Sequence, residues 1–311
     1  MKTFWIHVLL LLGLGSAVQA EDFVNQDKGR KAAPLSVEKA DYKGWKLVWQ
    51  DEFNEDGKPD PQKWDYEKGL VRNEEPQWYQ PQNAFCKGGN LVIQGKKEIV
   101  KNPHYKEGSS QWQFNRKQAE YSSASLTTKG KFAWLYGRFE CRARFSPEEG
   151  MWPAFWTVGA TEGWPSCGEI DIMEYYKGTY LANLCWASGQ KHIALWSTTR
   201  TPVADFRKKD PQWDNKFHVF RMDWDKDYVS LYLDDILLNR TALEKTQNVL
   251  YEKQKNPFHQ PHIIILNLAL GKTGGKLDNI KWPATFEVDY VRVYQKENSP
   301  EAGTIDLAKK R

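Results

Sequence analysis

The chain has 311 residues, of which 40% are hydrophobic and 14% aromatic, which is enough for a packed core and excludes a disordered chain. Its 44 basic and 40 acidic residues leave a formal charge of +4 and are spread without a basic stripe, which argues against nucleic acid as a partner. The 15 Trp exceed what a core needs, so we expect several indoles to be partly exposed, where they suit a flat, weakly polar ligand.

The first 20 residues, MKTFWIHVLLLLGLGSAVQA, are typical of a cleavable signal peptide. Lys2 precedes an apolar run from Phe4 to Leu14, and small residues lead to Ala20. The run is too short to span a bilayer, and no later segment approaches the length of a membrane helix. We therefore predict a secreted protein, periplasmic or extracellular, with no membrane attachment after cleavage.

Residues 21–40 are polar and without periodicity, which predicts a linker, and residues 298–311 are interpreted as a flexible tail. Residues 41–297 between them read as one domain made of short strands separated by Gly, Pro, Asn and Asp. Alternating apolar and polar residues within these strands indicate an all-β, antiparallel β-sandwich. In the segment VSLYLDDILL, the pair Asp234 and Asp235 predicts the turn of a hairpin between two strands.

Four cysteines, Cys86, Cys141, Cys167 and Cys185, lie in apolar or small-residue surroundings and lack the paired spacing of a metal site. Four exported cysteines allow three disulfide pairings. We expect buried free thiols instead, because each sequence context suits a core position.

The stretch WPSCGEIDIMEYYKG, residues 164–178, holds three acids whose spacing does not fit a regular strand. Glu169 and Asp171 share one face of such a strand, whereas Glu174 points to the other face. A β-bulge near Ile172 or Met173 resets the alternation and brings all three acids onto one surface.

With this bulge, Glu169 and Glu174 are separated by four effective strand steps, or about 13 Å between their Cα atoms. If both side chains lean inward, their carboxyls approach to about 5 Å, the separation of retaining glycosidases. One carboxylate then acts as nucleophile and the other as proton donor, while Asp171 between them orients the nucleophile.

Aromatic residues crowd these acids, which favours a sugar site over the alternative of three acids on a solvated strand face. They are Trp152, Trp156, Trp164, Tyr175 and Tyr176. Aromatic rings pack against the apolar faces of sugars, whereas a solvated strand face prefers Lys and Thr. Some of the rings, Trp156 among them, are also candidates for the core.

The segments GEIDIME and GMWPAFW resemble the active-site strand of glycoside hydrolase family 16 and the segment before it, especially in the laminarinase-like, endo-β-1,3-glucanase branch. The resemblance continues in collinear order over about residues 44 to 296, through WKLVWQDEFN, PDPQKWDYE, RNEEPQWY, NAFCKGGNLVI, YSSASLTTKGKF, YGRFECRARF, ILNLALG and VDYVRVYQ. It implies a bent jelly roll whose concave face binds a glycan.

The resemblance also assigns roles to single residues. Glu169 becomes the nucleophile, Asp171 its assisting carboxylate and Glu174 the general acid/base, with Trp152 and Trp164 lining the subsites beside the cleaved bond. Further candidate substrate-binding residues are Arg72, Asn73, Gln77, Trp78, Tyr176 and Trp186.

No cofactor is expected for catalysis, but many family members carry a structural cation on the convex side. The resemblance makes Asp289 the side-chain ligand of a structural Ca²⁺, helped by backbone oxygens near Glu52 and Gly89. An ordinary acid at a strand edge is the alternative for Asp289.

The expected activity is that of a secreted, monomeric, retaining endo-β-glycanase acting on β-1,3-glucan (laminarin) or mixed-linkage β-1,3/1,4-glucan. Two alternatives stay open: an endo-β-galactosidase acting on galactans, poly-N-acetyllactosamine or mucin-type O-glycans, and a non-catalytic β-glucan-binding protein. The substrate stays open because residues 101–121 and 189–211 read as long loops over the cleft. In addition, Cys185 and Trp186 stand where many laminarinases have a His.

Overall fold

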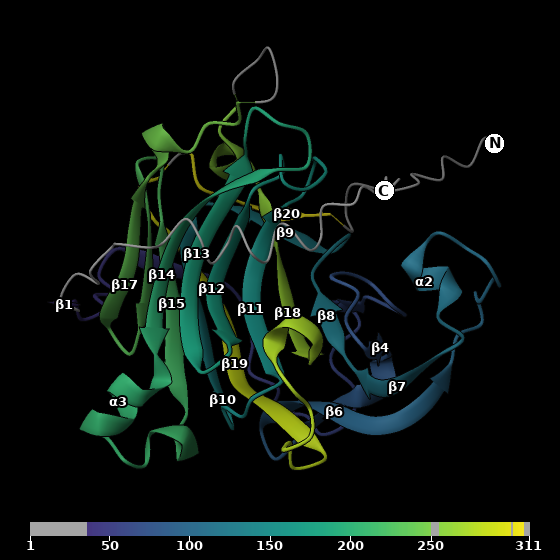
Figure 1. Cartoon of the computed structure of the whole chain (residues 1–311). Helices are drawn as coiled ribbons and strands as arrows, with labels where there is room; N and C mark the ends of the chain where they lie inside the picture. The colour runs from purple at the N-terminus through teal and green to yellow at the C-terminus, as the bar shows by residue number, and fades with distance from the viewer. Residues whose placement is uncertain (1–35, 250–254, 300, 308–311) are drawn as a thin grey trace.

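The computed structural model describes residues 36–249, 255–299 and 301–307, which form two β-sheets packed face to face (Figure 1). The strands in this part of the chain pair antiparallel, except that β4 (Gln77–Tyr79) and β7 (Gln118–Ser123) run parallel. The predicted all-β antiparallel sandwich is therefore confirmed.

The larger sheet has 11 strands, ordered β1-β17-β16-β15-β10-β19-β6-β7-β4, with β2 beside β19 and β5 beside β6. Besides β4 and β7 they are β1 (Ser36–Val37), β2 (Trp45–Asp51), β5 (Ala84–Lys87), β6 (Asn90–Lys101), β10 (Gly137–Phe145), β15 (His218–Trp224), β16 (Tyr228–Leu233), β17 (Ile236–Ala242) and β19 (Ala284–Lys296).

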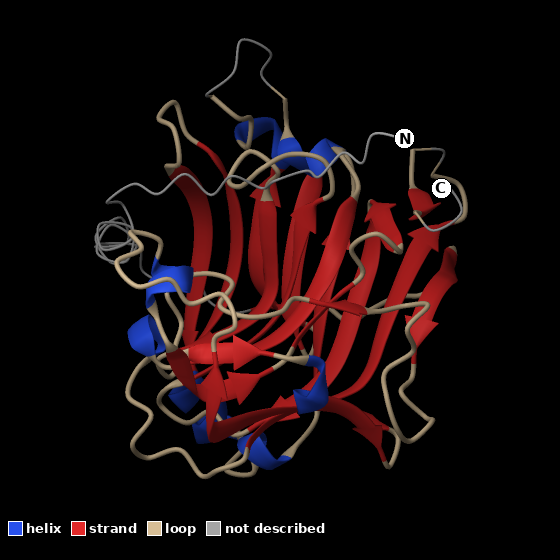
Figure 2. Cartoon of the chain, turned by 90° about the vertical axis from the view of Figure 1, so that its right-hand side faces the viewer, coloured by secondary structure: helices blue, strands red, loops and turns tan. Residues whose placement is uncertain are grey.

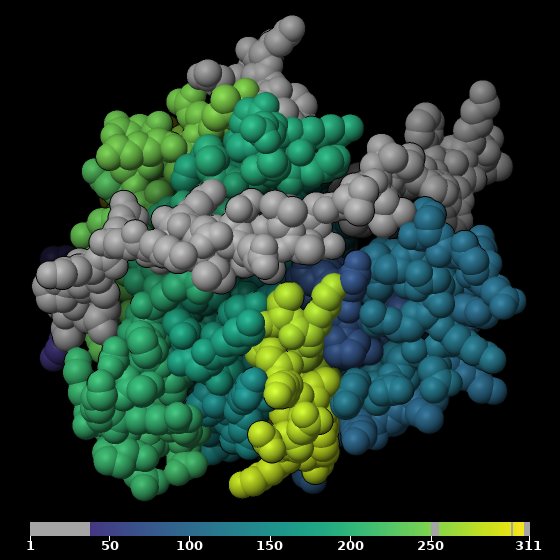
Figure 3. All heavy atoms as spheres, in the orientation of Figure 1, coloured from purple at the N-terminus to yellow at the C-terminus, as the bar shows by residue number. Residues whose placement is uncertain are grey.

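The second sheet has nine strands, ordered β14-β13-β12-β11-β18-β8-β3, with β9 joining β18 to β20. They are β3 (Asp65–Tyr66), β8 (Ser125–Thr127), β9 (Phe132–Leu135), β11 (Met151–Gly159), β12 (Glu169–Tyr176), β13 (Thr179–Ala187), β14 (Ala194–Pro202), β18 (His262–Leu270) and β20 (Gly303–Asp306). In the space-filling view, the yellow segment with β18 lies between teal atoms of the central strands and blue atoms of residues near 100 (Figure 3). Segments far apart in sequence thus build one face.

Helices are short pieces in the connections (Figure 2). They are α2 (Trp112–Asn115), α3 (Val203–Lys209), η1 (Pro81–Asn83), η2 (Trp213–Asn215), η3 (Leu243–Lys245), η4 (Pro257–His259) and η5 (Lys272–Gly274). Among the residues that the structure describes, none of these helices has the length and apolar character needed to cross a membrane.

The hydrophobic core lies between the two sheets and follows from the alternation within each strand. In β6, Leu91 and Ile93 are fully buried, whereas Val92 between them is partly exposed on the outer side. Each buried side chain of this size contributes about 1.5–3 kcal/mol by leaving water. The indoles of Trp134 and Trp224 fill the same core, so part of the high Trp content is structural.

The predicted hairpin is confirmed between β16 and β17. Asp234 and Asp235 at its turn have φ angles of 46° and 64°. Short polar side chains tolerate this left-handed region, and two such residues in succession suit the right-handed twist of the flanking strands.

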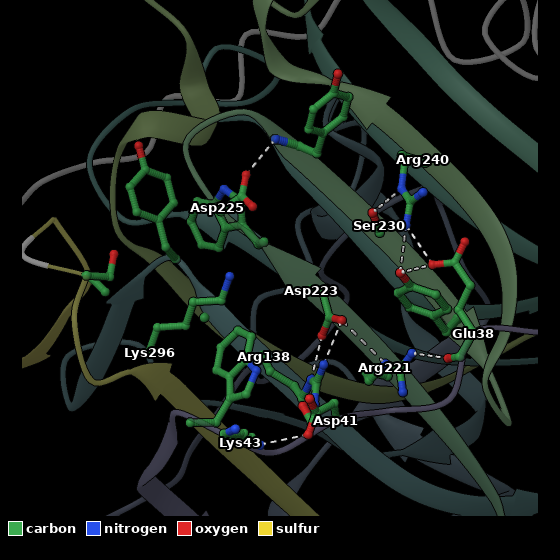
Figure 4. Close-up of a pocket in the computed structure, with 18 of the residues that line it drawn as sticks. Glu38, Asp41, Lys43, Arg138, Arg221, Asp223, Asp225, Ser230, Arg240 and Lys296 are labelled. Atoms are coloured by element: carbon green, nitrogen blue, oxygen red, sulfur yellow. Dashed lines mark hydrogen bonds and ion pairs between the residues drawn. The ribbon is translucent and has the colours of Figure 1, made fainter.

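After β1 pairs with β17 at the edge of the larger sheet, Glu38, Asp41 and Lys43 line a hollow of about 700 Å³ (Figure 4). The Glu38 carboxylate accepts a hydrogen bond from Arg240 at 2.7 Å, and the Glu38 backbone carbonyl accepts one from Arg221 at 3.0 Å. Arg221 also pairs with Asp235, and Arg138 pairs with Asp223 at 2.6 Å. All three guanidiniums have carboxylate partners within the protein. The charged groups of the hollow therefore hold the residues around Glu38 against the larger sheet.

Two expectations about the ends of the domain are therefore corrected. Residues 36–40, expected as part of the linker, are bound to β16 and β17, and residues 303–306, expected as flexible tail, form β20. The pairing of β20 with β9 is a long-range contact that local composition does not encode. The predicted signal peptide and the remainder of the linker lie outside the described residues.

Two further expectations have opposite outcomes. All four cysteines are free and buried, which confirms the preference for free thiols. Residues 189–211, expected as a loop over the cleft, instead contain β14, which pairs along the whole of β13, and then α3. The polar and β-branched residues of β14 suit an edge strand because one of its sides faces water.

Candidate active site

The three acids lie on β12, and the predicted bulge is present between them. Asp171 pairs with Asn183 and Glu174 pairs with Leu181 on β13, so two residues of β12 oppose one residue of β13. The register against β11 shifts at the same place. Ile172 and Met173, the two residues that face a single residue of β13, both point into the core. Because consecutive residues take the core side there, the three acids share the opposite face.

Glu174 is held by two donors. The indole Nε1 of Trp152 donates to its Oε1 at 2.6 Å, and the Nδ2 of Asn183 donates to its Oε2 at 3.0 Å. Burial, followed by the neighbouring Asp171, raises the pKa of Glu174 to about 8, against the lowering effects of Trp152, Arg200 and Asn183. Glu174 therefore keeps a proton at neutral pH.

Glu169 lies at the other end of the triplet. Its Oε2 accepts a hydrogen bond from the indole Nε1 of Trp164 at 3.0 Å, and Asp171 also hydrogen-bonds to it. Burial and the neighbouring Glu174 raise the pKa of Glu169 to about 7, while Arg72, Trp164 and Asp171 oppose the rise. Both glutamates thus titrate above their usual range, and Glu174 keeps the proton that a general acid needs.

Asp171 connects the two glutamates. Burial and the neighbouring Glu169 raise its pKa well above the usual value, so its proton serves as a donor to the Glu169 carboxylate. Its Oδ2 accepts a hydrogen bond from Asn183 at 2.9 Å. The three acids and Asn183 therefore form one connected chain of hydrogen bonds.

Aromatic rings border the acids, but of the five predicted rings Tyr175 is an exception, because it is 1% exposed and belongs to the core cluster. Trp152 meets Tyr176 edge to face, with ring centroids 4.9 Å apart, and Trp164 is 40% exposed. Trp156 is not a core residue, since it is only half-buried, donates to Asn267 at 2.7 Å and lies 5.0 Å beneath the Arg72 guanidinium. These partly covered rings suit the apolar faces of sugars.

The segment RNEEPQWY divides into residues near the cleft and residues beneath it. Arg72 reaches the neighbourhood of Glu169 and pairs with Glu67, while Asn73 donates to Glu75 at 3.1 Å. Gln77, expected to bind substrate, is only 1% exposed. Its Nε2 donates to Glu75 at 2.6 Å and its Oε1 accepts from the backbone of Leu270 at 3.1 Å. The prediction for Gln77 is therefore wrong, because both ends of its amide are used within the protein.

Trp78, from the same segment, is half-buried and packs on backbone. A Cβ added to Gly69 would lie 3.4 Å from its ring, so the indole covers this glycine closely. The remainder of the ring surface is available to solvent.

The prediction for Trp186 is also wrong. Trp186 is 9% exposed and belongs to the core cluster, whereas its neighbour Cys185 pairs with Glu169 across the β12–β13 ladder. Alternation along β13 places Asn183 and Cys185 on the face of the acids and Trp186 on the core face. The sequence of β13 alone does not reveal this, because nothing in it shows which of the alternating residues face the core.

Two residues near the acids were missed by sequence reasoning. Asn183 on β13 bonds two of the acids, and Arg200 on β14 lowers the pKa of Glu174. Arg200 pairs with Leu181 in the ladder, which lies two residues from Asn183 and therefore on the same face. Both residues can be found from the alternation of side chains along β13, once the position of the bulge is known.

The expected cation site is not supported. Asp289 forms an ion pair with Arg142 at 2.5 Å, and the Glu52 carboxylate pairs with Arg292. Among the residues that the structure describes, no three His, Cys, Asp or Glu side chains gather as metal ligands do. A guanidinium therefore neutralises the carboxylate that the resemblance assigned to Ca²⁺.

The chain is similar to known proteins with a related site. Residues 89–292 match the family model of the glycosyl hydrolases family 16. The chain is 36% identical to a β-glucanase of Rhodothermus marinus, over 81% of this chain and 85% of that protein. It is 30% identical to a keratan-sulfate endo-1,4-β-galactosidase of Sphingobacterium multivorum, over 81% of this chain and 55% of that protein, so it spans about half of that relative's length.

Solved structures give the same picture. One reported with the endo-acting O-glycanases that prominent members of the human gut microbiota express to initiate mucin breakdown superposes with a TM-score of 0.73 at 32% identity, over 88% of this chain and 97% of that chain. The laminarinase catalytic domain of Thermotoga maritima superposes with a TM-score of 0.67 at 31% identity, over 82% and 99% of the two chains.

Proposed function

The chain belongs to the glycosyl hydrolases family 16, as the resemblance predicted, and we propose that it is a retaining endo-β-glycanase whose catalytic residues are Glu169, Asp171 and Glu174. The observation that carries this proposal is the bulge in β12, which places Glu169, held by Trp164 and Asp171, and the protonated Glu174 on one face. A site that only binds glycan needs aromatic rings but no such pair.

In the first step, the Glu169 carboxylate attacks the anomeric carbon and the glycosidic C–O bond breaks. The proton of Glu174 passes to the departing oxygen, so the leaving sugar departs as an alcohol. The hydrogen bonds from Trp164 and Asp171 orient Glu169 for this attack, and the Trp152 indole stabilises the carboxylate that Glu174 becomes.

In the second step, the Glu174 carboxylate takes a proton from water, and the water oxygen attacks the same anomeric carbon. The ester bond to Glu169 breaks, which restores both side chains and the original anomeric configuration. Asp171 donates to Glu169 throughout, so it steadies the leaving carboxylate.

β-1,3-Glucan or mixed-linkage β-1,3/1,4-glucan is the first substrate class. The match to the Rhodothermus β-glucanase, at 36% identity, and the superposition on the Thermotoga laminarinase support this class. The half-buried rings of Trp152 and Tyr176 and the exposed Trp164 offer stacking surfaces beside the acids.

Glycans built on β-linked galactose, including mucin-type O-glycans, are the second class. The structure reported with O-glycanases superposes over 97% of its length with a TM-score of 0.73, against 0.67 for the Thermotoga laminarinase, and a keratan-sulfate endo-galactosidase is among the relatives. Cys185, which pairs with Glu169 in the ladder, and Trp186 stand where many laminarinases have a His, and this departure keeps the second class open.

The test is a panel of laminarin, barley β-glucan, agarose, carrageenan, keratan-type glycan and mucin, incubated with wild type and with Glu169→Gln and resolved by product size. We expect a ladder of oligosaccharides from one substrate with wild type and none with the variant. An NMR time course in which the β-anomer of the product appears first establishes retention of the anomeric configuration. If no polymer is cut while one retards both proteins equally in an affinity gel, the enzyme proposal fails.

We also propose export of the chain and action as a monomer. The signal-peptide pattern of residues 1–20 supports export. N-terminal sequencing of protein recovered from outside the cytoplasm, with a start near residue 21, tests the leader, and light scattering tests the monomer.

A further inference from the structure

Asn183 is a feature of the site that the proposed roles of the three acids do not use. It is fully buried on β13 and pairs with Asp171, the last residue of β12 before the bulge. A bulge interrupts the ladder of backbone hydrogen bonds, so the side chains around it need other contacts to hold their positions. Asn183 supplies such a contact across the interruption.

The hydrogen bonds of Asn183 are one-sided. Its Nδ2 donates to Asp171 at 2.9 Å and to Glu174 at 3.0 Å, while its buried Oδ1 has no hydrogen-bond partner. A buried acceptor without a partner is costly, and buried amides normally satisfy both ends. Asn83, which is equally buried, accepts from Gln80 at 2.8 Å and donates to the Gln94 carbonyl at 2.8 Å. Asn183 thus leaves its acceptor unpaired and keeps its donor for the acids.

We propose that Asn183 is a positioning residue that fixes Glu174 relative to Asp171 across the bulge and stabilises the carboxylate that Glu174 becomes when it gives its proton to the leaving sugar. This inference rests on the proposed function of the site and adds a residue to it. A donor to a charged group acts most strongly in a site sheltered from water.

The other groups around Glu174 define what the loss of Asn183 would change. Asp171 on β12 raises the pKa of Glu174, Arg200 on β14 lowers it, and Trp152 on β11 donates to the second oxygen. Asn183 on β13 also lowers this pKa. Without its N–H donor, the proton is held more tightly, and the carboxylate needed in the second step becomes less stable.

The test uses two indoles as reporters of the two glutamates. In protein labelled with ¹⁵N-tryptophan, the Trp152 indole N–H resonance follows Glu174 and the Trp164 resonance follows Glu169, with assignments from Trp152→Phe and Trp164→Phe. The variants are Asn183→Ala and Asn183→Leu, which keeps most of the volume of the side chain, adds no charge and lacks the N–H donor. Asn83→Ala is the matched control because it removes an equally buried amide elsewhere.

We expect the midpoint of the Trp152 titration to rise by about one pH unit or more in both Asn183 variants and to stay unchanged in Asn83→Ala. With substrate, kcat should fall by about 10- to 100-fold, KM should change far less, and the alkaline limb of kcat/KM should move upward with the Trp152 midpoint.

An unchanged Trp152 midpoint in a folded Asn183→Leu protein would overturn the proposal, as would an equal shift in Asn83→Ala. The titration needs no substrate, so it decides the role of Asn183 even if wild type cuts none of the panel, an outcome that refutes the proposed function separately.

Discussion

Replacing Glu174 by Gln should stabilise the protein, and the gain should depend on pH. In the folded state burial raises the pKa of Glu174 to about 8, from 4.5 for an exposed glutamate. The folded chain therefore holds a proton that the unfolded chain releases across this range. Stability falls with rising pH wherever the folded state binds more protons, so wild type loses stability from about pH 4.5 to about pH 8. The variant has no such proton.

The size of the effect follows from the shift. Each pKa unit corresponds to about 1.4 kcal/mol, so the shift of Glu174 corresponds to about 5 kcal/mol at pH 9 and to almost nothing at pH 4. For a domain of this size, such a difference raises the melting temperature by roughly 10 °C. An enzyme that holds a buried proton donor accepts this loss of stability for the sake of function.

The measurement is a series of thermal melts of wild type, Glu174→Gln and the control Glu107→Gln between pH 4 and pH 9. Glu107 is exposed, so its variant should follow wild type at every pH. The gap between Glu174→Gln and wild type should be small at pH 4 and widen to its maximum near pH 8 to 9. A gap that is constant with pH, or that shrinks as pH rises, would refute the reasoning.

Three further predictions concern other parts of the chain. Arg72→Met should raise the pKa of Glu169, because the guanidinium favours the carboxylate, so the acid limb of the kcat/KM profile should move up by about one pH unit; an unmoved limb contradicts the assigned electrostatics. Trp186→Ala should destabilise the fold by about 3–5 kcal/mol in denaturant titrations, whereas Trp164→Ala should leave stability nearly unchanged and impair glycan cleavage; the reverse pattern would place Trp186 in the cleft after all. Melts with and without reductant should coincide because all four cysteines are free, and a lower melting temperature under reductant would reveal a disulfide.

Much of the fold was readable from local patterns. A strand with one wet face alternates apolar and polar residues, and this period is visible in a few residues of sequence, as in the segment of Leu91 and Ile93. The bulge was readable for the same reason, since Glu174 violates the parity that Glu169 and Asp171 establish. The aromatic residues beside the acids then indicated a sugar site.

Local patterns failed where the answer depends on a partner strand. Trp and Gln commonly contact glycans, but both Trp186 and Gln77 are buried. The Gln77 amide hydrogen-bonds to Glu75 and to the backbone of Leu270. The strand β20 formed in an expected tail because β9 offers a free edge. A strand that reads as polar composition becomes ordered when an edge elsewhere accepts its hydrogen bonds.

The sequence by itself determined the class of fold, the bulged strand and the three acids, because each depends on alternation within one short segment. Only the tertiary structure decided which neighbours those acids have. Asn183 and Arg200 reach them through the register of β13 and β14, and a shift of one residue in that register would turn both side chains to the opposite face. Register is set by packing against distant strands, so the chemistry of the site is completed by contacts that no local pattern contains.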